Sequence, residues 1–467
     1  MNEFSINMAI LRRFFVIFSA IAISVAGSGC ASYYDANKPM FTTQFIQGNF
    51  AEAKDTIVDQ ELSPAELYLS SDVFFTGLCA GTAALNADAY SESINRFDMA
   101  ENAMNQGRTD GYPVKYYEKV MLNTYKALAF LKAGDRNNAR VEFNRAYVRQ
   151  GDAIEENKAA IAEAQKNNEQ KMQQNQANVN QTLTAANRQI AAAYPEFQGF
   201  QAYSDFANPF TTYLSGLFLL MAAEDHSDID TGLLSLKRAQ AMVPENPYIP
   251  DDITMGENLA KGIHPSPMVY VLYEGGIRSG ITKLTFRIPF YLGSGVKFAK
   301  ISLPKLTPQQ NPPSGVTILA DTHSYPTSLL ADIDRIVLGE FEERFPIEVT
   351  KAILWMTANL IAQEAAQQAI RQGTDRRSDS MLWGGLAAAA ISEISNPVEI
   401  RCWDTLPRTI AIARLPMPTN GSIDIQTPDG ALLAKKLRVN YGTPFTVIHI
   451  RQVLNGGAAA IKIIPIQ

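Results

Sequence analysis

Residues 268–274 have the sequence MVYVLYE, and they mark the point where the chain changes from a helical to a strand pattern. Before them, from Phe41 to about Pro250, apolar residues recur at helical spacing, and Gly and Asp fall at the breaks. After them, short apolar runs are bounded by Gly and Pro turns, as strands are. The sequence therefore predicts an α+β protein with an amino-terminal helical domain at 30–250 and a carboxy-terminal β-rich domain at 251–467.

The β-rich domain is predicted from a series of short strand-like runs. These runs are 268–274, 283–288, 297–303, 316–320, 399–403, 409–415, 422–426, 445–451 and 460–464. Pro428-Asp429-Gly430 and Asn455-Gly456-Gly457 are turn sequences between the later runs. Mostly antiparallel pairing in a sandwich-like domain is the expected result.

A helical insertion at 345–396 separates two sets of these strands. Residues 345–372 carry apolar residues at helical spacing, and residues 381–394 are rich in Ala and Gly. Charged residues interrupt the first segment, and the second is shorter than the ~20 apolar residues that a membrane span needs. We therefore expect this helical pair to pack on the sheet or against the helical domain.

Three predicted helices share the small–large–small spacing that is typical of the second helix of a tetratricopeptide repeat. The three sets are Ser93/Phe97/Ala100, Ala139/Phe143/Ala146 and Gly232/Leu236/Ala239. Small residues let two helices approach closely, and the large residue fills the groove between them. The spacing between the sets exceeds the usual repeat length, and the Trp and Gly-Tyr markers are missing. An irregular helical bundle is therefore the alternative to a tetratricopeptide-like domain.

Residues 152–193 form a polar insert in the helical domain, rich in Gln, Asn, Ala and Lys. Its few apolar residues make a thin seam: Ile154, Ile161, Met172, Val179, Leu183 and Ile190. A long projecting helix or a helical hairpin, with one narrow face for a partner, fits this pattern. A mobile, partly disordered linker is the alternative.

The first 30 residues resemble a bacterial lipoprotein signal peptide. Arg12 and Arg13 precede an apolar run, and Gly27-Ser28-Gly29 leads into Cys30. This order of charge, apolar run and small residues is typical of a secretory signal. A cysteine at the cleavage point can be lipidated, for example with palmitate, which anchors a protein without spanning the membrane. Removal of residues 1–29 and lipidation of Cys30 are therefore expected.

Two details refine this expectation. Met8 is an alternative start to Met1, because Glu3 is unusual in a positively charged leader. Ala31 follows the cysteine where Asp would favour the inner membrane, so an outer-membrane lipoprotein facing the periplasm is expected. A cleaved signal that leaves Cys30 unmodified is the alternative, since Gly27 stands where the lipoprotein pattern prefers Leu.

The net charge of the chain limits the kinds of molecule that it can bind. The 467-residue chain has a formal net charge of -6, which argues against a nucleic-acid partner.

Besides Cys30 the chain has Cys79 and Cys402, which could form a disulfide in an oxidising compartment. We favour two buried thiols instead.

No combination of residues predicts catalysis, a metal site or a cofactor, so we expect a protein that is not an enzyme. His226, His264, His323 and His449 lack the close spacing of zinc ligands. Asp321-Thr322-His323-Ser324 contains the residue types of a catalytic triad, but neighbours in sequence seldom point at one another as a triad requires. We expect a solvated loop there.

Arg401, Trp403 and Arg414 are the candidate binding residues. On a strand Arg401 and Trp403 share a face, and Arg414 joins them if the next strand pairs antiparallel. Such a face suits a peptide or a glycan carboxylate. The alternative, which we favour, is a core position for Trp403 and an acidic partner for Arg401.

Several of these segments together resemble a family of uncharacterised bacterial lipoproteins with tetratricopeptide-like repeats. The resemblance rests on the run from Asp334 to Pro416, with Arg401-Cys402-Trp403-Asp404-Thr405-Leu406-Pro407, on Tyr273-Glu274-Gly275-Gly276, and on the helical pairs. It implies a place beside outer-membrane lipoprotein activators of penicillin-binding proteins.

The expected function is that of a membrane-anchored protein–protein adaptor or scaffold in cell-envelope assembly. Helical pairs build extended surfaces for protein partners, and the lipid would confine the partner to the membrane surface. The alternative is a glycan- or peptidoglycan-binding module carried by the β-rich domain.

Overall fold

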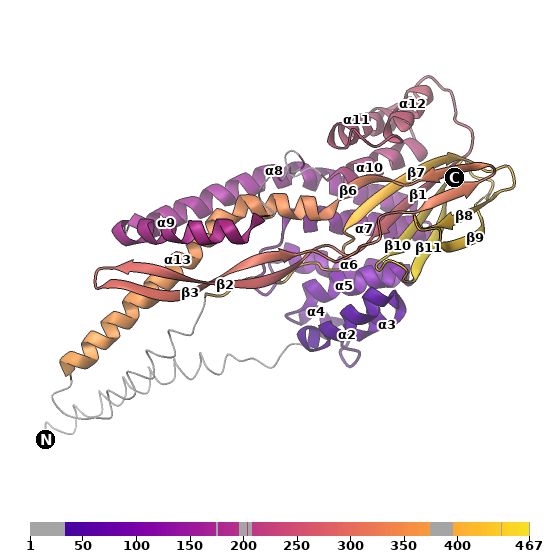
Figure 1. The fold of residues 1–467 in the computed structure, drawn as a ribbon. Helices are drawn as coiled ribbons and strands as arrows, with labels where there is room; N and C mark the ends of the chain where they lie inside the picture. Colours follow the sequence, from indigo (N-terminus) through magenta and orange to yellow (C-terminus); the bar gives the residue numbers. More distant parts are fainter. Residues whose placement is uncertain are drawn as a thin grey trace.

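A computed structural model describes residues 33–173, 176–195, 203, 208–373, 396–439 and 441–466. Helices fill the amino-terminal half and strands dominate the carboxy-terminal half, which confirms the α+β class (Figure 1). The signal segment, Cys30 and the expected helix at 381–394 lie outside the described residues. No helix in the described ranges is both long enough and apolar enough to cross a membrane.

The amino-terminal half consists of helices of very different lengths. They are α2 (Tyr33–Gln47), α3 (Phe50–Thr56), α4 (Pro64–Leu69), α5 (Val73–Asn86), α6 (Tyr90–Asn105), α7 (Tyr116–Ala133), α8 (Arg136–Gln173), α9 (Gln176–Ala193), α10 (Pro209–Met221), α11 (His226–Met242) and α12 (Ile249–Leu259). The polar insert is helical: it forms the second half of α8 and all of α9.

The three helices with the small–large–small spacing are α6, α8 and α11, and their marker residues are buried. Each packs against the helix before it, α5, α7 or α10. The approach between α10 and α11 is close, because a Cβ on Gly216 would lie 2.9 Å from the carbonyl oxygen of Gly232. Small residues are therefore needed at this crossing because any side chain would meet backbone.

The carboxy-terminal half contains three sheets and one more long helix. The strands are β1 (Met268–Gly275), β2 (Gly280–Leu292), β3 (Gly295–Thr307), β4 (Thr317–Ala320), β5 (His323–Pro326), β6 (Ser328–Asp332), β7 (Thr409–Pro416), β8 (Ser422–Gln426), β9 (Leu432–Arg438), β10 (Phe445–Gln452) and β11 (Ala459–Ile466); the helix is α13 (Ile333–Gly373). The sheets have the orders β11-β10-β1-β7-β6, β2-β3 and β5-β4-β8-β9. Pairing is antiparallel except between β1 and β10, which run parallel.

Most of the predicted strands are confirmed, and the differences have local causes. Residues 399–403 are not a strand; they cross between other elements without joining a sheet. Strands β5, β6 and β9 were not predicted, because β5 and β6 are only 4 and 5 residues long and β9 contains no buried residue. Helix α13 begins at Ile333 rather than at residue 345.

Strand β1 is buried along its whole length because both of its faces are covered. Met268, Tyr270 and Leu272 face the core shared with the helices. The alternating residues, including Val269 and Val271, face a second core against the four-stranded sheet. The five-stranded sheet is therefore the middle layer of the body, with helices on one side and strands on the other (Figure 1).

The second half of α8, α9, the β2–β3 hairpin and α13 together form an arm that extends from the body (Figure 1). The arm has its own core, in which Val179 and Ile190 of α9 pack with residues of the hairpin and of α13, such as Ile288 and Ile353. Val179 and Ile190 of the apolar seam thus pack inside the protein, with Met172 and Leu183 partly buried against them, where we had expected a face for a partner.

The Gly216–Gly232 crossing gives a first test of this packing. Gly216→Ala should lower the free energy of unfolding by about 1–3 kcal/mol, since the new methyl group meets the backbone of α11. Gly151 of α8 is the matched control, because a Cβ there meets nothing within 4 Å. Gly151→Ala should leave the stability unchanged or raise it by up to about 1 kcal/mol. Urea unfolding measures both, and equal effects would contradict the close crossing.

Candidate functional site

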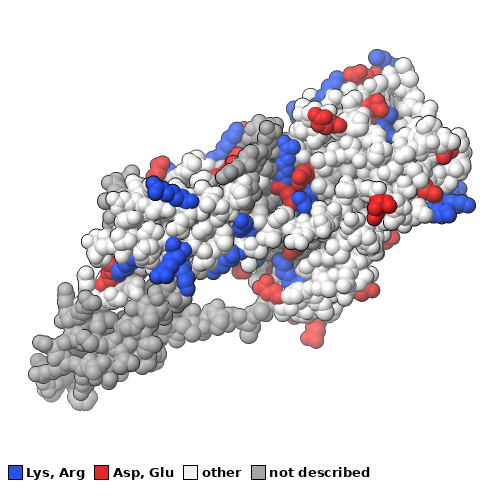
Figure 2. Space-filling model, viewed as in Figure 1, with Lys and Arg blue, Asp and Glu red and all other residues white. Residues whose placement is uncertain are grey.

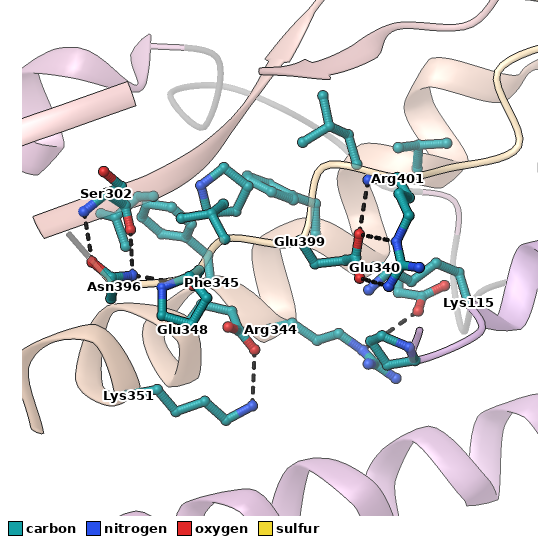
Figure 3. Close-up of a pocket in the computed structure, with 18 of the residues that line it drawn as sticks. Lys115, Ser302, Glu340, Arg344, Phe345, Glu348, Lys351, Asn396, Glu399 and Arg401 are labelled. Atoms are coloured by element: carbon teal, nitrogen blue, oxygen red, sulfur yellow. Dashed lines mark hydrogen bonds and ion pairs between the residues drawn. The ribbon is translucent and has the colours of Figure 1, made fainter. Parts of the chain in front are cut away.

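One hollow among the described residues lies where the arm leaves the body. It is a groove of about 960 Å³, counting the space at its open mouth, and we call it the junction groove (Figure 3). Its walls come from the start of α7, the base of the β2–β3 hairpin, α13 and residues 396–401. A ligand in the groove would therefore touch the helical half, the arm and the carboxy-terminal half together.

The floor of the groove is mostly apolar. Its apolar lining residues are Pro113, Tyr117, Ile281, Leu303, Pro304, Val337, Phe341, Phe345, Pro397 and Val398. Leu303 and Phe345 belong to the core of the arm, and Val337 belongs to the core of the body. The floor is therefore held by both cores, which favours a preformed shape.

One wall of the groove is a stretch outside any helix or strand, residues 396–403, which we call the crossing segment. At one end the Asn396 side chain accepts a hydrogen bond from the backbone N–H of Ser302 (2.7 Å) and donates one to its carbonyl (2.8 Å). At the other end the Trp403 backbone N–H donates to Glu118 Oε1 (3.0 Å). The Trp403 indole is buried and donates to Thr82 and Thr405. Both ends of the segment are thus fixed to buried groups.

Two carboxylates of the groove are held by arginines (Figure 3). Glu399 Oε2 lies 2.6 Å from a guanidinium nitrogen of Arg401, and its Oε1 accepts from the Arg401 backbone N–H at 2.9 Å. Burial opposes the charge of Glu399, but the hydrogen bonds and charge of Arg401 outweigh it and lower the pKa of Glu399. Glu340 is buried, with Oε1 3.4 Å from Arg344 Nε and Oε2 accepting from the backbone N–H of Tyr116. Burial dominates there and raises the pKa of Glu340.

Lys115 differs from the other cations of the groove. Its charge acts on both Glu340 and Glu399, but among the described residues no carboxylate lies within ion-pair distance of its ammonium group. The ammonium group lies 5.7 Å from the centre of the Tyr112 ring. Lys115 is therefore a half-buried cation at the groove that has room for an anionic partner.

The structure places Arg401, Trp403 and Arg414 in three separate surroundings. Arg401 pairs with Glu399 and with Asp110 at 3.2 Å. Trp403 is a core aromatic, with its ring against Phe97 and Tyr125. The shared strand face is not formed, because residues 399–403 are not a strand and the Trp403 side chain turns into the helical core.

Arg414 belongs to a buried polar cluster under α12. Its Nε lies 2.9 Å from Asp252 Oδ1, and Tyr213 and Tyr270 each donate a hydroxyl hydrogen bond of 2.8 Å to the same carboxyl group. Burial raises the pKa of Asp252 to about 6, despite the opposing charge of Arg414 and the two hydroxyl donors. The cluster links α10 and α12 to strands β1 and β7.

The remaining polar candidates do not come together. Asp321 accepts hydrogen bonds from the hydroxyl and the backbone N–H of Thr419, while His323 and Ser324 are exposed at the start of β5. No group of three metal-ligating side chains occurs in the described ranges. Cys79 and Cys402 are both buried free thiols.

The sequence did not single out Lys115, Glu340 or Arg344 as site residues. Lys115 precedes α7, whereas Glu340 and Arg344 lie far along the chain on α13, and none belongs to a recognisable motif. Among the groove residues, only Arg401 was a candidate from the sequence. Spacing alone gave no signal for the rest, since the groove forms only when α7 meets α13.

A search of known protein families, curated proteins and solved structures found no match to this chain. On the face seen in Figure 2, basic and acidic side chains are interspersed.

The Asp252 cluster predicts a pH-dependent contribution to stability. Because the folded pKa (about 6) lies above the ordinary value of 3.8, this group favours the folded state below pH 4 and loses that contribution as the pH rises through 6. Asp252→Asn should remove the effect, so the wild type should lose up to about 3 kcal/mol relative to the variant between pH 4 and pH 7. Urea unfolding across this range measures the difference.

Asp251→Asn is the matched control, because the Asp251 side chain is 65% exposed and lies at the edge of the same cluster. Its stability difference from the wild type should stay nearly constant over the same range. A constant difference for Asp252→Asn as well would contradict the raised pKa.

Proposed function

We propose that this protein is a membrane-anchored adaptor of the bacterial cell envelope that binds a protein partner in its junction groove. The observation that carries the proposal is the position of the groove, between the helical half, the arm and the crossing segment. A partner held there contacts surfaces from three parts of the chain. The junction groove combines an apolar floor with a few fixed polar groups, as ligand-binding sites commonly do.

The membrane anchor and the repeat architecture belong to the same proposal. Cys30 would carry the lipid, and the mature chain would lie at the outer membrane, facing the periplasm. The packed pairs α5–α6, α7–α8 and α10–α11 support a tetratricopeptide-like arrangement. The two facing sheets support a sandwich-like carboxy-terminal half.

Glycan binding by the β-rich half is less well supported. A sugar site would need exposed aromatic side chains on the facing sheets. Tyr270 and Tyr273 of the central strand are buried instead, and their hydroxyl groups bond to Asp252 and Gln452. We therefore place protein binding first.

The anchor can be tested with a single substitution. Cys30→Ser removes the thiol that the lipid needs, so the protein should move from the membrane fraction to the soluble fraction of lysed cells. Cys79→Ser is the control, since Cys79 is buried in the helical core. Membrane retention of the Cys30→Ser protein would count against the lipoprotein proposal.

Site-specific photocrosslinking in intact envelopes tests the adaptor role. A photoreactive residue at Ile400, on the crossing segment and 47% exposed, should give a discrete adduct with another protein. Leu432 on β9 is the matched control, with 55% exposure at a distance from the groove, and it should give none. Val148 and Leu234, exposed on α8 and α11, sample the outer helical surface. Absence of adducts at every position would contradict the adaptor function.

A further inference from the structure

We infer that the junction groove binds an extended peptide segment that carries a carboxylate, by pairing it with the backbone of the crossing segment. The inference rests on the proposed function and names the chemistry of the partner. Three independent features of the groove support it: open backbone groups, an apolar floor and an unpaired cation.

The first feature is the backbone of Val398, Glu399 and Ile400. In the part of the chain that the structure describes, the N–H and C=O groups of these three residues make no hydrogen bond. The segment is held at Asn396 and at Trp403, and its middle belongs to no helix or sheet. A chain that is fixed at both ends and has open backbone donors and acceptors can act as the template on which a peptide adds as a strand.

The second feature is the floor beside this template. Val398 lines the groove together with Leu303 and Phe345, and the latter two are nearly fully buried. Side chains of an extended peptide alternate between two faces, so every second one would point toward this floor. The floor therefore favours a peptide with apolar residues at alternate positions.

The third feature is the charge at the α7 end. Among the residues that the structure describes, no carboxylate pairs with Lys115, whereas Arg401 is held by Glu399 and Asp110. Arg344 is held in place by Glu340 at 3.4 Å and by the Tyr116 ring, 5.2 Å from its guanidinium carbon. A carboxylate of the peptide, from Asp, Glu or the chain terminus, would complete the pairing of Lys115.

The test begins with a selection against the purified full chain. Random octapeptides with free carboxy termini are displayed on phage, and the enriched peptides are synthesised with a fluorescent label. Affinity is measured for the wild type, for Lys115→Gln and for the control Lys237→Gln. Lys237 lies on α11, with its side chain 55% exposed and paired to Glu257.

The expected peptides bind the wild type and the Lys237→Gln protein equally, and bind Lys115→Gln about tenfold more weakly. Neutralising the peptide carboxylate should also cost about tenfold with the wild type, but little with Lys115→Gln, because the two changes remove one interaction. N-methylation of the peptide backbone should weaken binding at alternate residues only, as strand pairing requires. That last readout does not depend on any protein variant.

Other results would overturn the inference. One is a peptide that tolerates N-methylation everywhere and binds Lys115→Gln as tightly as the wild type. Another is dodecanoate binding that is lost in Lys115→Gln while no peptide is enriched, which would assign the groove to a fatty-acid chain. Photocrosslinks confined to Val148 and Leu234 would support the adaptor function but would show that the partner does not bind in the groove.

Discussion

The whole structure depends on burying strand β1 on both faces. Its even-numbered residues require helices above them, and its odd-numbered residues require a second sheet below. Near its end the strand carries Glu274, a buried carboxylate that accepts a hydrogen bond from Tyr125 of α7 at 3.0 Å and lies 3.8 Å from Arg451 of β10. Because a buried charge must be paired, this contact fixes the direction in which the helices lie on the sheet. The helical and strand halves consequently share one core.

The junction groove follows from the same constraint. Once α7 is fixed on the sheet, its first turn meets α13, and the buried Glu340 accepts a hydrogen bond from the backbone N–H of Tyr116. The crossing segment then reaches the helical core through Trp403. The polar groups of the groove are therefore set by contacts that also hold the fold together, which limits how far they can move when a ligand binds.

Much of the fold was predictable because its signals are local. The spacing of Gly232, Leu236 and Ala239 shows which side of α11 is buried, and MVYVLYE marks a buried strand. Residues 399–403 show where local reasoning fails. An alternating pattern suggested a strand, but the Trp403 indole found hydrogen-bond partners in Thr82 and Thr405 and a place in the helical core. Its burial there outweighs strand pairing. The groove could not be predicted, since Lys115 and Glu340 become neighbours only through tertiary contacts between α7 and α13.

Helices α8 and α13 pass without a break from the core of the body into the core of the arm. At 1.5 Å per residue, they are about 57 and 62 Å long. Because both helices contribute to both cores, they hold the arm to the body more stiffly than a loop connection would. A force applied at the tip of the β2–β3 hairpin would therefore be carried along α8 and α13 to the place where α13 packs against α7.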